Sequence, residues 1–339
     1  MFGLLPRERL ERQAGASDYA MVAAADAIFG DAAVHWLVEN PGTMIVAANG
    51  RPLGIAVEER RAAAAMAAIE RRSDEFPSVT TEALGPRYIR KLRTRSPMLA
   101  LSLEDVSVTK AERLLFANVY KGVTDVVTKW LWPEPALWAT RLAARLRISP
   151  NAITVTGMAL TVLAGLLFYR GGIAAALVAA WTMTFLDTVD GKLARVTVTS
   201  SRIGNLLDHG TDIIHPPLWW LCLAQGLAGN DPGASRMIWT MCWIILGAYV
   251  VGRAVELSFH RFFGFNGFLY ARIDSMFRLV VARRNILLLI MSAGLLLGQA
   301  TAAFAACAGW SVISTVIQAV RLAQAGVAAR KHRLSPWIA

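Results

Sequence analysis

Long apolar runs separated by short charged stretches dominate the second half of the chain. Six such runs occupy residues 152–170, 173–190, 203–227, 237–259, 285–299 and 301–321. An α-helix needs roughly 20 apolar residues to cross a bilayer, and most of these runs approach that length. The run at 285–299 is the shortest. The pattern predicts an all-α integral membrane domain with six transmembrane helices over residues 151–325.

Residues 1–110 follow a different pattern, in which charged and apolar positions are mixed. The run Thr43–Ala48 predicts a buried strand, and Leu53–Val57 predicts its hairpin partner across an Asn49-Gly50 turn. The alanine-rich stretch 59–72 has charged ends and predicts a helix. We therefore expect a small soluble α/β domain before the membrane domain.

Residues 111–150 connect these two parts and are expected to form an amphipathic juxtamembrane region. Within residues 121–147, tryptophans are mixed with basic side chains, a composition that suits a helix lying among lipid headgroups. The alternative is an ordinary surface helix packed on the N-terminal domain. The sequence Ser149-Pro150-Asn151 then predicts the cap of the first membrane helix.

Charge is distributed unevenly along the chain, which has 35 Lys and Arg, 24 Asp and Glu, and a net charge of +11. Basic residues gather in 191–202, 260–284 and the basic tail 326–339, but are sparse near 171, 228–236 and 300. The positive-inside rule places both chain ends in the cytoplasm. Basic clusters beside membrane spans favour anionic lipid headgroups as partners, so we expect no nucleic acid.

The three cysteines lie in apolar runs at Cys222, Cys242 and Cys307. Their spacing suits neither a metal site nor a disulfide framework. We expect them to be small buried apolar side chains.

Four carboxylates lie inside or beside the apolar runs, where an ionised group is costly and is usually kept for function. Asp187 and Asp190 are three residues apart, and Asp208 and Asp212 are four apart. Each pair therefore lies on one face of a helix. Two such helices facing each other would offer oxygen ligands to one or two divalent cations. The alternative is that Arg195 and Arg202 neutralise the carboxylates as buried ion pairs.

This segment resembles the signature of the CDP-alcohol phosphotransferase family of integral membrane enzymes. It reads Asp, two residues, Asp-Gly, two residues, Ala-Arg, eight residues, Gly, three residues, Asp, three residues, Asp. Those positions are Asp187, Asp190, Gly191, Ala194, Arg195, Gly204, Asp208 and Asp212. The resemblance covers about residues 120–325.

The resemblance implies a role for each position of the signature. Asp187, Asp190 and Asp208 would be metal ligands, and Asp212 would be a further ligand or the general base that accepts the acceptor's proton. The implied cofactor is Mg²⁺ or Mn²⁺, with two ions. The nucleotide of the donor would contact Asp187, Asp190, Gly191, Ala194, Arg195 and Gly204.

The arginine-rich stretch Ala271–Asn285 resembles, less specifically, the inositol-using branch of the family. There, arginines receive the phosphate of the acceptor. The candidates here are Lys192, Arg202, Arg272, Arg278, Arg283 and Arg284. The alternative for each is positive-inside charge alone. Arg253 and Glu256, three residues apart, are either a structural ion pair or part of a polar cavity.

The implied function is transfer of a substituted phosphate from a CDP-alcohol to a hydroxyl in phospholipid synthesis, with release of CMP. The leading hypothesis is phosphatidylinositol-phosphate-type synthesis, or transfer from CDP-inositol to a lipid. The alternatives are a phosphatidylglycerophosphate-type or other polar-alcohol acceptor. The implied partners are the CDP-alcohol, the alcohol or phospho-alcohol acceptor, a membrane lipid and a second copy of the chain. The implied location is a bacterial inner membrane, with the active site facing the cytoplasm.

Two other classes of protein share some of these features. A catalytically silent membrane scaffold would also have this fold, but the signature retains all four carboxylates. A transporter is disfavoured because the carboxylates cluster at the ends of two spans, not at the midplane.

The N-terminal domain is expected to be non-catalytic. Some relatives carry a nucleotidyltransferase at this position, which requires a glycine-rich loop to cradle phosphates. The stretch Ala48–Gly54 is better explained as a hairpin. A docking, dimerisation or degenerate domain is expected instead.

Overall fold

The computed structural model describes residues 1–15, 17–199 and 202–339, and gives the backbone but not the side chains of residues 202–209. These residues divide into two compact units. The N-terminal unit consists of Met1–Gly122, Leu137–Ile148 and Lys192–Ser200, and the helical unit of Val123–Ala136, Ser149–Gly191 and Ser201–Ala339.

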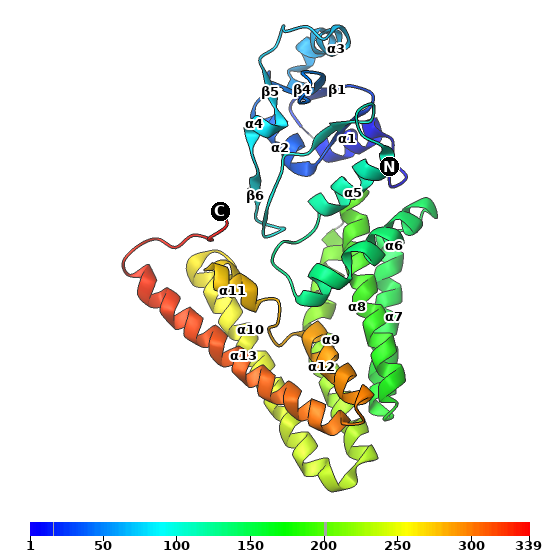
Figure 1. The fold of residues 1–339 in the computed structure, drawn as a ribbon, viewed down its shortest axis with the longest axis vertical. Coiled ribbons are helices and arrows are strands. Elements are labelled where there is room, and N and C mark those ends of the chain that lie inside the picture. Colours follow the sequence, from blue (N-terminus) through cyan, green and yellow to red (C-terminus); the bar gives the residue numbers. More distant parts are fainter. Residues whose placement is uncertain (16, 200–201) are drawn as a thin grey trace. The chain divides into compact units, whose positions relative to one another are not determined.

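The N-terminal unit is built on a four-stranded sheet of order β1-β4-β3-β5 (Figure 1). Strand β3 is antiparallel to β4 and parallel to β5. The strands are β1 Ala20–Ala23, β2 Ala27–Phe29, β3 Met44–Val46, β4 Pro52–Val57, β5 Ser78–Thr80, β6 Arg87–Ile89, β7 Thr94–Ser96 and β8 Ala100–Ser102. The helices are α1 Pro6–Ala14, α2 Asp31–Glu39, η1 Glu59–Arg61, α3 Ala62–Arg71, α4 Thr81–Leu84 and α5 Val108–Asn118.

The expected α/β architecture of the N-terminal unit is confirmed. Strands β3 and β4 form the predicted hairpin, and Gly50 in its turn adopts a φ of 78°, which favours glycine. Helix α3 lies within the predicted helical stretch and buries Ala65, Ala68 and Ile69. The apolar face of the sheet and this helix make a core that holds the unit together.

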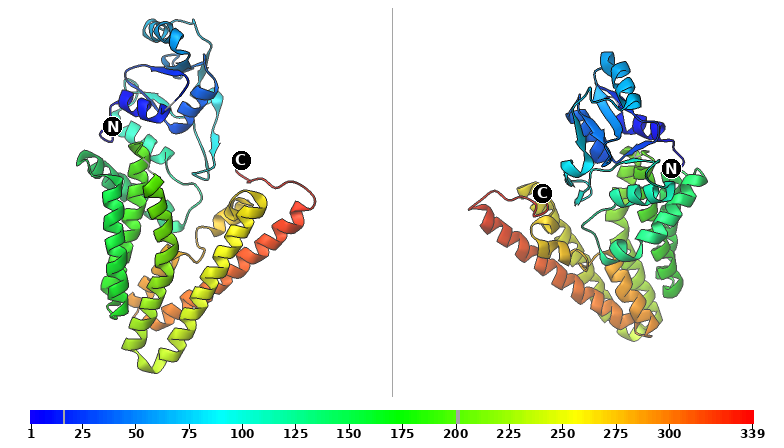
Figure 2. Two further views of the ribbon diagram at one scale, coloured as in Figure 1. Left: turned by 180° about the vertical axis from the view of Figure 1, so that it is seen from behind. Right: turned by 45° about the horizontal axis from the view of Figure 1, so that its top comes forward.

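The helical unit contains a helix at each of the six predicted apolar segments (Figure 2). Those helices are α7 Pro150–Tyr169, α8 Ile173–Val196, α9 Arg202–Asn230, α10 Ser235–Phe263, α12 Arg284–Leu296 and α13 Ala300–Ala329. Shorter helical segments are η2 Val127–Leu131, η3 Pro232–Ala234, η4 Gly267–Leu269 and α11 Arg272–Phe277. Helix α6 Pro133–Arg145 is shared between the two units, and the last residues of α8, from Lys192 on, belong to the N-terminal unit.

Close helix packing forms the core of the helical unit. Helix α10 lies along α13, and α7 lies along α9. Phe168 and Phe304 are fully buried in this core. At Gly226 of α9, an added Cβ would lie 1.9 Å from the carbonyl oxygen of Phe168 at the end of α7. Glycine therefore permits the close approach of α9 to α7, as small residues do between membrane helices.

Helix α9 contains two consecutive prolines, Pro216 and Pro217. A proline has no N–H, so the carbonyl four residues earlier loses its helical partner. For Pro217 that carbonyl belongs to Ile213, and it accepts a hydrogen bond of 2.8 Å from the hydroxyl of Tyr249 in α10. A side chain of a neighbouring helix thus satisfies a backbone group that α9 itself leaves open.

Four helices among the described residues are long and apolar enough to cross a membrane. They are α7, α8, α10 together with η3, and α13. Helix α12 is apolar but has only 13 residues. Large apolar side chains remain exposed on α7, α10 and α13, including Val162, Val250 and Val316. Exposed apolar faces of this kind suit contact with lipid.

The region before α7 differs from a single continuous helix over 121–147. A π-helical segment, η2, precedes α6, which begins at Pro133 because proline fits the first turn of a helix but not its interior. Trp130 and Trp138 are exposed. Ser149 caps α7 as predicted, accepting a hydrogen bond from the backbone of Ala152.

Cys242 and Cys307 are buried and Cys222 is half-buried, and all three are free thiols.

Candidate functional site

Two carboxylates on different helices converge on one arginine. Asp187 lies on α8 and Asp212 on α9, whereas Arg284 is the first residue of α12. The Arg284 Nη2 atom is 2.7 Å from Asp187 Oδ2, and its Nη1 atom is 2.9 Å from Asp212 Oδ1. The fork of the guanidinium thus spans the two helices, as its geometry permits. One carboxylate of each predicted pair, Asp187 and Asp212, thus meets at Arg284.

Asp190 lies one turn after Asp187 on α8 and is 7% exposed. Its Oδ2 accepts a hydrogen bond of 2.6 Å from the hydroxyl of Thr154 on α7. A hydrogen bond donated to a carboxylate stabilises the ionised form. The sequence reasoning did not identify Thr154, although it lies one turn into the helix that the Ser149 cap begins.

His215 lies one turn after Asp212 and is buried. Its Nε2 is 3.3 Å from Arg284 Nη1, and its Nδ1 is 2.6 Å from the carbonyl oxygen of Thr211. Arginine only donates, so Nε2 accepts and the imidazole proton is assigned to Nδ1. His215 is therefore a neutral neighbour that helps to hold the Arg284 guanidinium.

A fifth carboxylate, Asp125, contacts the first turn of α12 through Asn285. The side-chain amide of Asn285 donates to Asp125 Oδ1 at 3.1 Å, and the backbone N–H of Thr128 donates to the same oxygen at 3.0 Å. Burial raises the pKa of Asp125, but the Thr128 N–H, the Arg278 charge and the Asn285 amide outweigh it and lower the pKa. Asp125 was missed, although a lone carboxylate in the apolar stretch 123–127 was a visible signal.

The other arginines of the predicted acceptor group have different surroundings. Arg283 forms an ion pair with Glu256, which also lies 3.4 Å from Arg253. The predicted ion pair within α10 is therefore confirmed and extended to α12. Arg278 is buried with its guanidinium 5.6 Å from the ring centre of Phe268. Arg272 is exposed. Contact of these side chains with an acceptor stays a prediction.

The remaining signature residues divide between the described and undescribed parts. Gly191 and Ala194 continue α8 and are half-buried. Lys192 is buried in the N-terminal unit, 3.4 Å from the ring centre of Tyr120. Arg195 is half-buried in the same unit. The side chains of Asp208, Gly204 and Arg202 lie outside the described residues.

The carboxylate oxygens of this site are suitable ligands for a hard divalent cation. Among the described side chains, no three His, Cys, Asp or Glu residues come close enough to hold a metal, and Asp208 is not one of those side chains. Asp187 and Asp212 nevertheless already converge on a positive group. Oxygen donors of this type are preferred by Mg²⁺ and Mn²⁺. The residues present therefore fit the expected cofactor.

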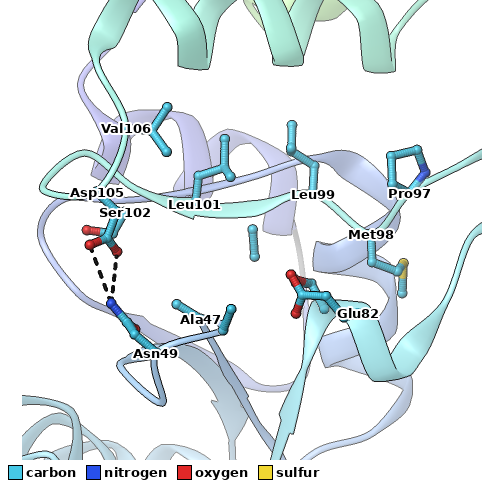
Figure 3. Close-up of a pocket in the computed structure, with 13 residues that line it drawn as sticks. Ala47, Asn49, Glu82, Pro97, Met98, Leu99, Leu101, Ser102, Asp105 and Val106 are labelled. Atoms are coloured by element: carbon cyan, nitrogen blue, oxygen red, sulfur yellow. Dashed lines mark hydrogen bonds between the residues drawn. The ribbon is translucent and has the colours of Figure 1, made fainter.

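The N-terminal unit has a cavity of about 470 Å³ at the ends of β3 and β5. Figure 3 shows Asn49, Asp105 and Glu82 among the residues that line it, together with apolar side chains such as Leu101. Asn49 donates to Asp105 at 3.4 Å. None of its lining residues is basic. The stretch Ala48–Gly54 forms the predicted hairpin, not a phosphate loop.

Residues 147–320 match the family model for CDP-alcohol phosphatidyltransferase. The chain belongs to this family. The match contains the whole aspartate signature, helices α7, α8, α9, α10 and α12, and most of α13. The resemblance seen in the sequence is thus confirmed. With four helices able to span a membrane, this family member is an integral membrane protein.

One curated relative of this family member is the archaetidylinositol phosphate synthase of Pyrococcus horikoshii. The two chains are 41% identical over 70 residues, which is 20% of this chain and 37% of the relative. The match therefore spans little more than a third of that protein.

Two solved structures of Mycobacterium tuberculosis phosphatidylinositol phosphate synthase are also similar. The one with CDP-DAG bound is 19% identical, with a TM-score of 0.42, and the match covers 56% of this chain and 94% of that one. The one in complex with manganese and citrate is 20% identical, with a TM-score of 0.43, and the match covers 55% and 88%.

Proposed function

We propose that the protein transfers a substituted phosphate from a CDP-alcohol to an acceptor hydroxyl and releases CMP. The observation that carries this proposal is the convergence of Asp187 and Asp212 on one cationic group. Both lie within residues 147–320, the segment that matches the family.

The reaction exchanges one P–O bond for another. The acceptor oxygen attacks the phosphorus that carries the donor's alcohol, the bond from that phosphorus to the bridging oxygen of the diphosphate breaks, and CMP leaves with that oxygen. The acceptor's proton passes to a carboxylate. A bound divalent cation would neutralise the diphosphate and the developing negative charge.

The side chains of the helical unit fit the two tasks of binding and proton transfer. Asp187, Asp190 and Asp208 would hold the cation, and Asp212 would be a further ligand or the base. The side chain of Asp212 is 47% exposed, against 24% for Asp187. Its greater exposure lets an acceptor hydroxyl reach it, which favours the base role for Asp212.

The acceptor or donor is proposed to contain an inositol group. The relative with 41% identity over 70 residues is named as an archaetidylinositol phosphate synthase. Arg253, Arg278 and Arg283 also gather between α10 and α12, and arginine is well suited to bind a phosphate. These observations support a phosphorylated inositol in preference to an uncharged alcohol.

The proposed setting is a bacterial inner membrane with the site facing the cytoplasm. Helices α9 and α12 would join the four long apolar helices to give six spans. A homodimer is proposed from the family alone. The N-terminal unit is proposed to act outside the reaction, because the stretch Ala48–Gly54 forms a hairpin and not a glycine-rich phosphate loop.

The test is CMP release by the purified full-length protein in detergent with Mg²⁺ or Mn²⁺. CDP-diacylglycerol is offered with inositol phosphate, inositol, glycerol phosphate or serine, and CDP-inositol is offered with lipid acceptors. An Asp208→Asn variant is the control. We expect release with an inositol-containing pair and its loss in the control. Release with glycerol phosphate alone would replace the substrate assignment, and the absence of both release and metal-dependent nucleotide binding would favour the scaffold.

A further inference from the structure

Arg284 occupies the position at which positive charge is needed between α8 and α9. Its two terminal nitrogens each contact a different carboxylate, Asp187 or Asp212. Resting on the proposed function, we propose that Arg284 is the internal counter-ion of this site. A divalent cation that binds the two carboxylates then competes with the guanidinium for them.

The need for a counter-ion between α8 and α9 is electrostatic. Two carboxylates that face each other repel, and one of them takes up a proton unless a cation lies close by. Arg284 provides this cation from within the chain, so the two helices can approach with both carboxylates ionised. A guanidinium keeps its charge throughout the physiological pH range.

The oxygen atoms that Arg284 contacts are among those that a metal ion would use. Arg284 engages Asp187 Oδ2 and Asp212 Oδ1 at 2.7 and 2.9 Å. A metal ligated by the same oxygens at about 2.0–2.2 Å would be pressed against the guanidinium, which carries the same sign of charge. The repulsion between the two positive charges therefore weakens cation binding at these atoms for as long as the guanidinium stays in contact with them.

The Arg284 guanidinium is held in place on several sides. Its side chain is only 15% exposed, and His215 Nε2 lies 3.3 Å from Nη1. The next residue, Asn285, is tied to Asp125 at 3.1 Å and to Thr128 Oγ1 at 3.3 Å. The first turn of α12 is thereby anchored, and the arginine is not a loose surface side chain. A loose side chain would compete only weakly, because ordering it costs conformational entropy.

The adjacent residue, Arg283, provides a matched control. It starts from the same turn, but its ion pair is with Glu256 on α10. Replacing Arg283 removes the same charge from the chain without opening the contact with Asp187 and Asp212. A difference between the two variants therefore reports on the position of the charge and not on the net charge.

The experiment measures Mn²⁺ binding without substrate, from the electron paramagnetic resonance signal of free Mn²⁺. Full-length wild type, Arg284→Gln and Arg283→Gln are compared in detergent. Loss of a positive charge in contact with the ligands should tighten Mn²⁺ binding by about tenfold or more in Arg284→Gln. Arg283→Gln should remain close to wild type.

Unchanged or weaker Mn²⁺ binding in Arg284→Gln overturns the inference. If wild type binds Mn²⁺ and releases CMP in that case, the proposed function stands without it. Lack of Mn²⁺ binding in all three proteins overturns the inference and also the metal requirement of the proposed function. Thermal unfolding without metal checks that each variant is folded, and Arg284→Met repeats the measurement if the glutamine variant does not fold.

Discussion

The hydroxyl of Thr154 donates a 2.6 Å hydrogen bond to Asp190, and so links α7 to the carboxylates of α8. Removing such a second layer of contacts around metal ligands lowers metal affinity or activity about 10–100-fold. We predict a loss of this size for Thr154→Val. Thr154→Ser keeps the hydroxyl and should retain most activity. Titration of CMP release with Mn²⁺ tests this, and equal loss in both variants would contradict the role of the hydroxyl.

Asp187 and Asp212 should differ in what their replacement abolishes. Asp187→Asn removes a proposed cation ligand, so Mn²⁺ binding and CMP release should both be lost. If Asp212 is the base, Asp212→Asn should bind Mn²⁺ and the CDP-alcohol but turn over at least about 100-fold more slowly. Mn²⁺ binding and CMP release are measured on the same samples. Rapid turnover by Asp212→Asn would leave the carboxylate as a ligand only.

The anchor of α12 can be tested at Asp125. Asp125→Ala leaves the buried amide of Asn285 without its main acceptor, which costs about 1–3 kcal/mol of stability. Asp125→Asn keeps an oxygen at the same place and should cost less. The thermal unfolding midpoint in detergent is the measurement. Equal midpoints for both variants would show that Asp125 does not hold α12.

The packing of α9 against α7 predicts opposite outcomes for two glycines. Gly226→Ala places a methyl group 1.9 Å from the Phe168 carbonyl oxygen, so the helices must separate. Overpacking of this kind costs about 1–3 kcal/mol. Gly229→Ala, in the same helix, meets no atom within 4 Å and should be neutral or slightly stabilising. Thermal unfolding of both variants decides the matter, and a neutral Gly226→Ala would contradict the close approach.

The N-terminal unit should lose stability in acid through Asp26. Arg51 lies 2.9 Å from Asp26, and the Ser102 hydroxyl also donates to it. Burial raises the pKa of Asp26, but these contacts and backbone N–H groups outweigh it and hold the pKa below its ordinary value. The stabilisation is therefore complete above the unfolded-state pKa and is lost as the pH falls through the folded-state value.

The corresponding variant is Asp26→Asn in the full-length protein. Thermal unfolding is followed by the fluorescence of tryptophan between about pH 6 and pH 3. Wild type should lose more stability than Asp26→Asn as the pH decreases below about 4. Parallel pH curves for the two proteins would show that Asp26 makes no such contribution.

Local patterns determine those parts of the molecule that were predicted from sequence. The Asn49-Gly50 turn with apolar runs on either side predicts the hairpin of β3 and β4, and apolar runs of membrane length predict the long helices. The short strands β2 and β5 carry weaker patterns, since three residues cannot show a clear alternation. The parallel pairing of β3 with β5 also depends on contacts made only in the folded chain.

In the candidate site, too, some features were predicted from local sequence and others depend on tertiary packing. The spacing of Asp187 and Asp190 places both carboxylates on one helix face, and this was readable in advance. The partners of these groups come from distant positions: Thr154 precedes Asp190 by 36 residues, and Arg284 follows Asp187 by 97. Arg284 was predicted as a phosphate ligand because its charge was evident, but which groups neutralise it is decided by tertiary packing.

The hydrogen bond from Tyr249 to the Ile213 carbonyl has a consequence for Asp212, the residue before Ile213. The two prolines interrupt the hydrogen-bond ladder of α9 just beyond this carboxylate, so the helix alone does not fix its direction. The Tyr249 hydroxyl of α10 stabilises this weakened turn by its hydrogen bond to the Ile213 carbonyl. The direction of the Asp212 side chain, the proposed base, therefore depends on both α9 and α10. A change in the tilt of α10 would redirect Asp212 without altering any residue of the proposed cation site.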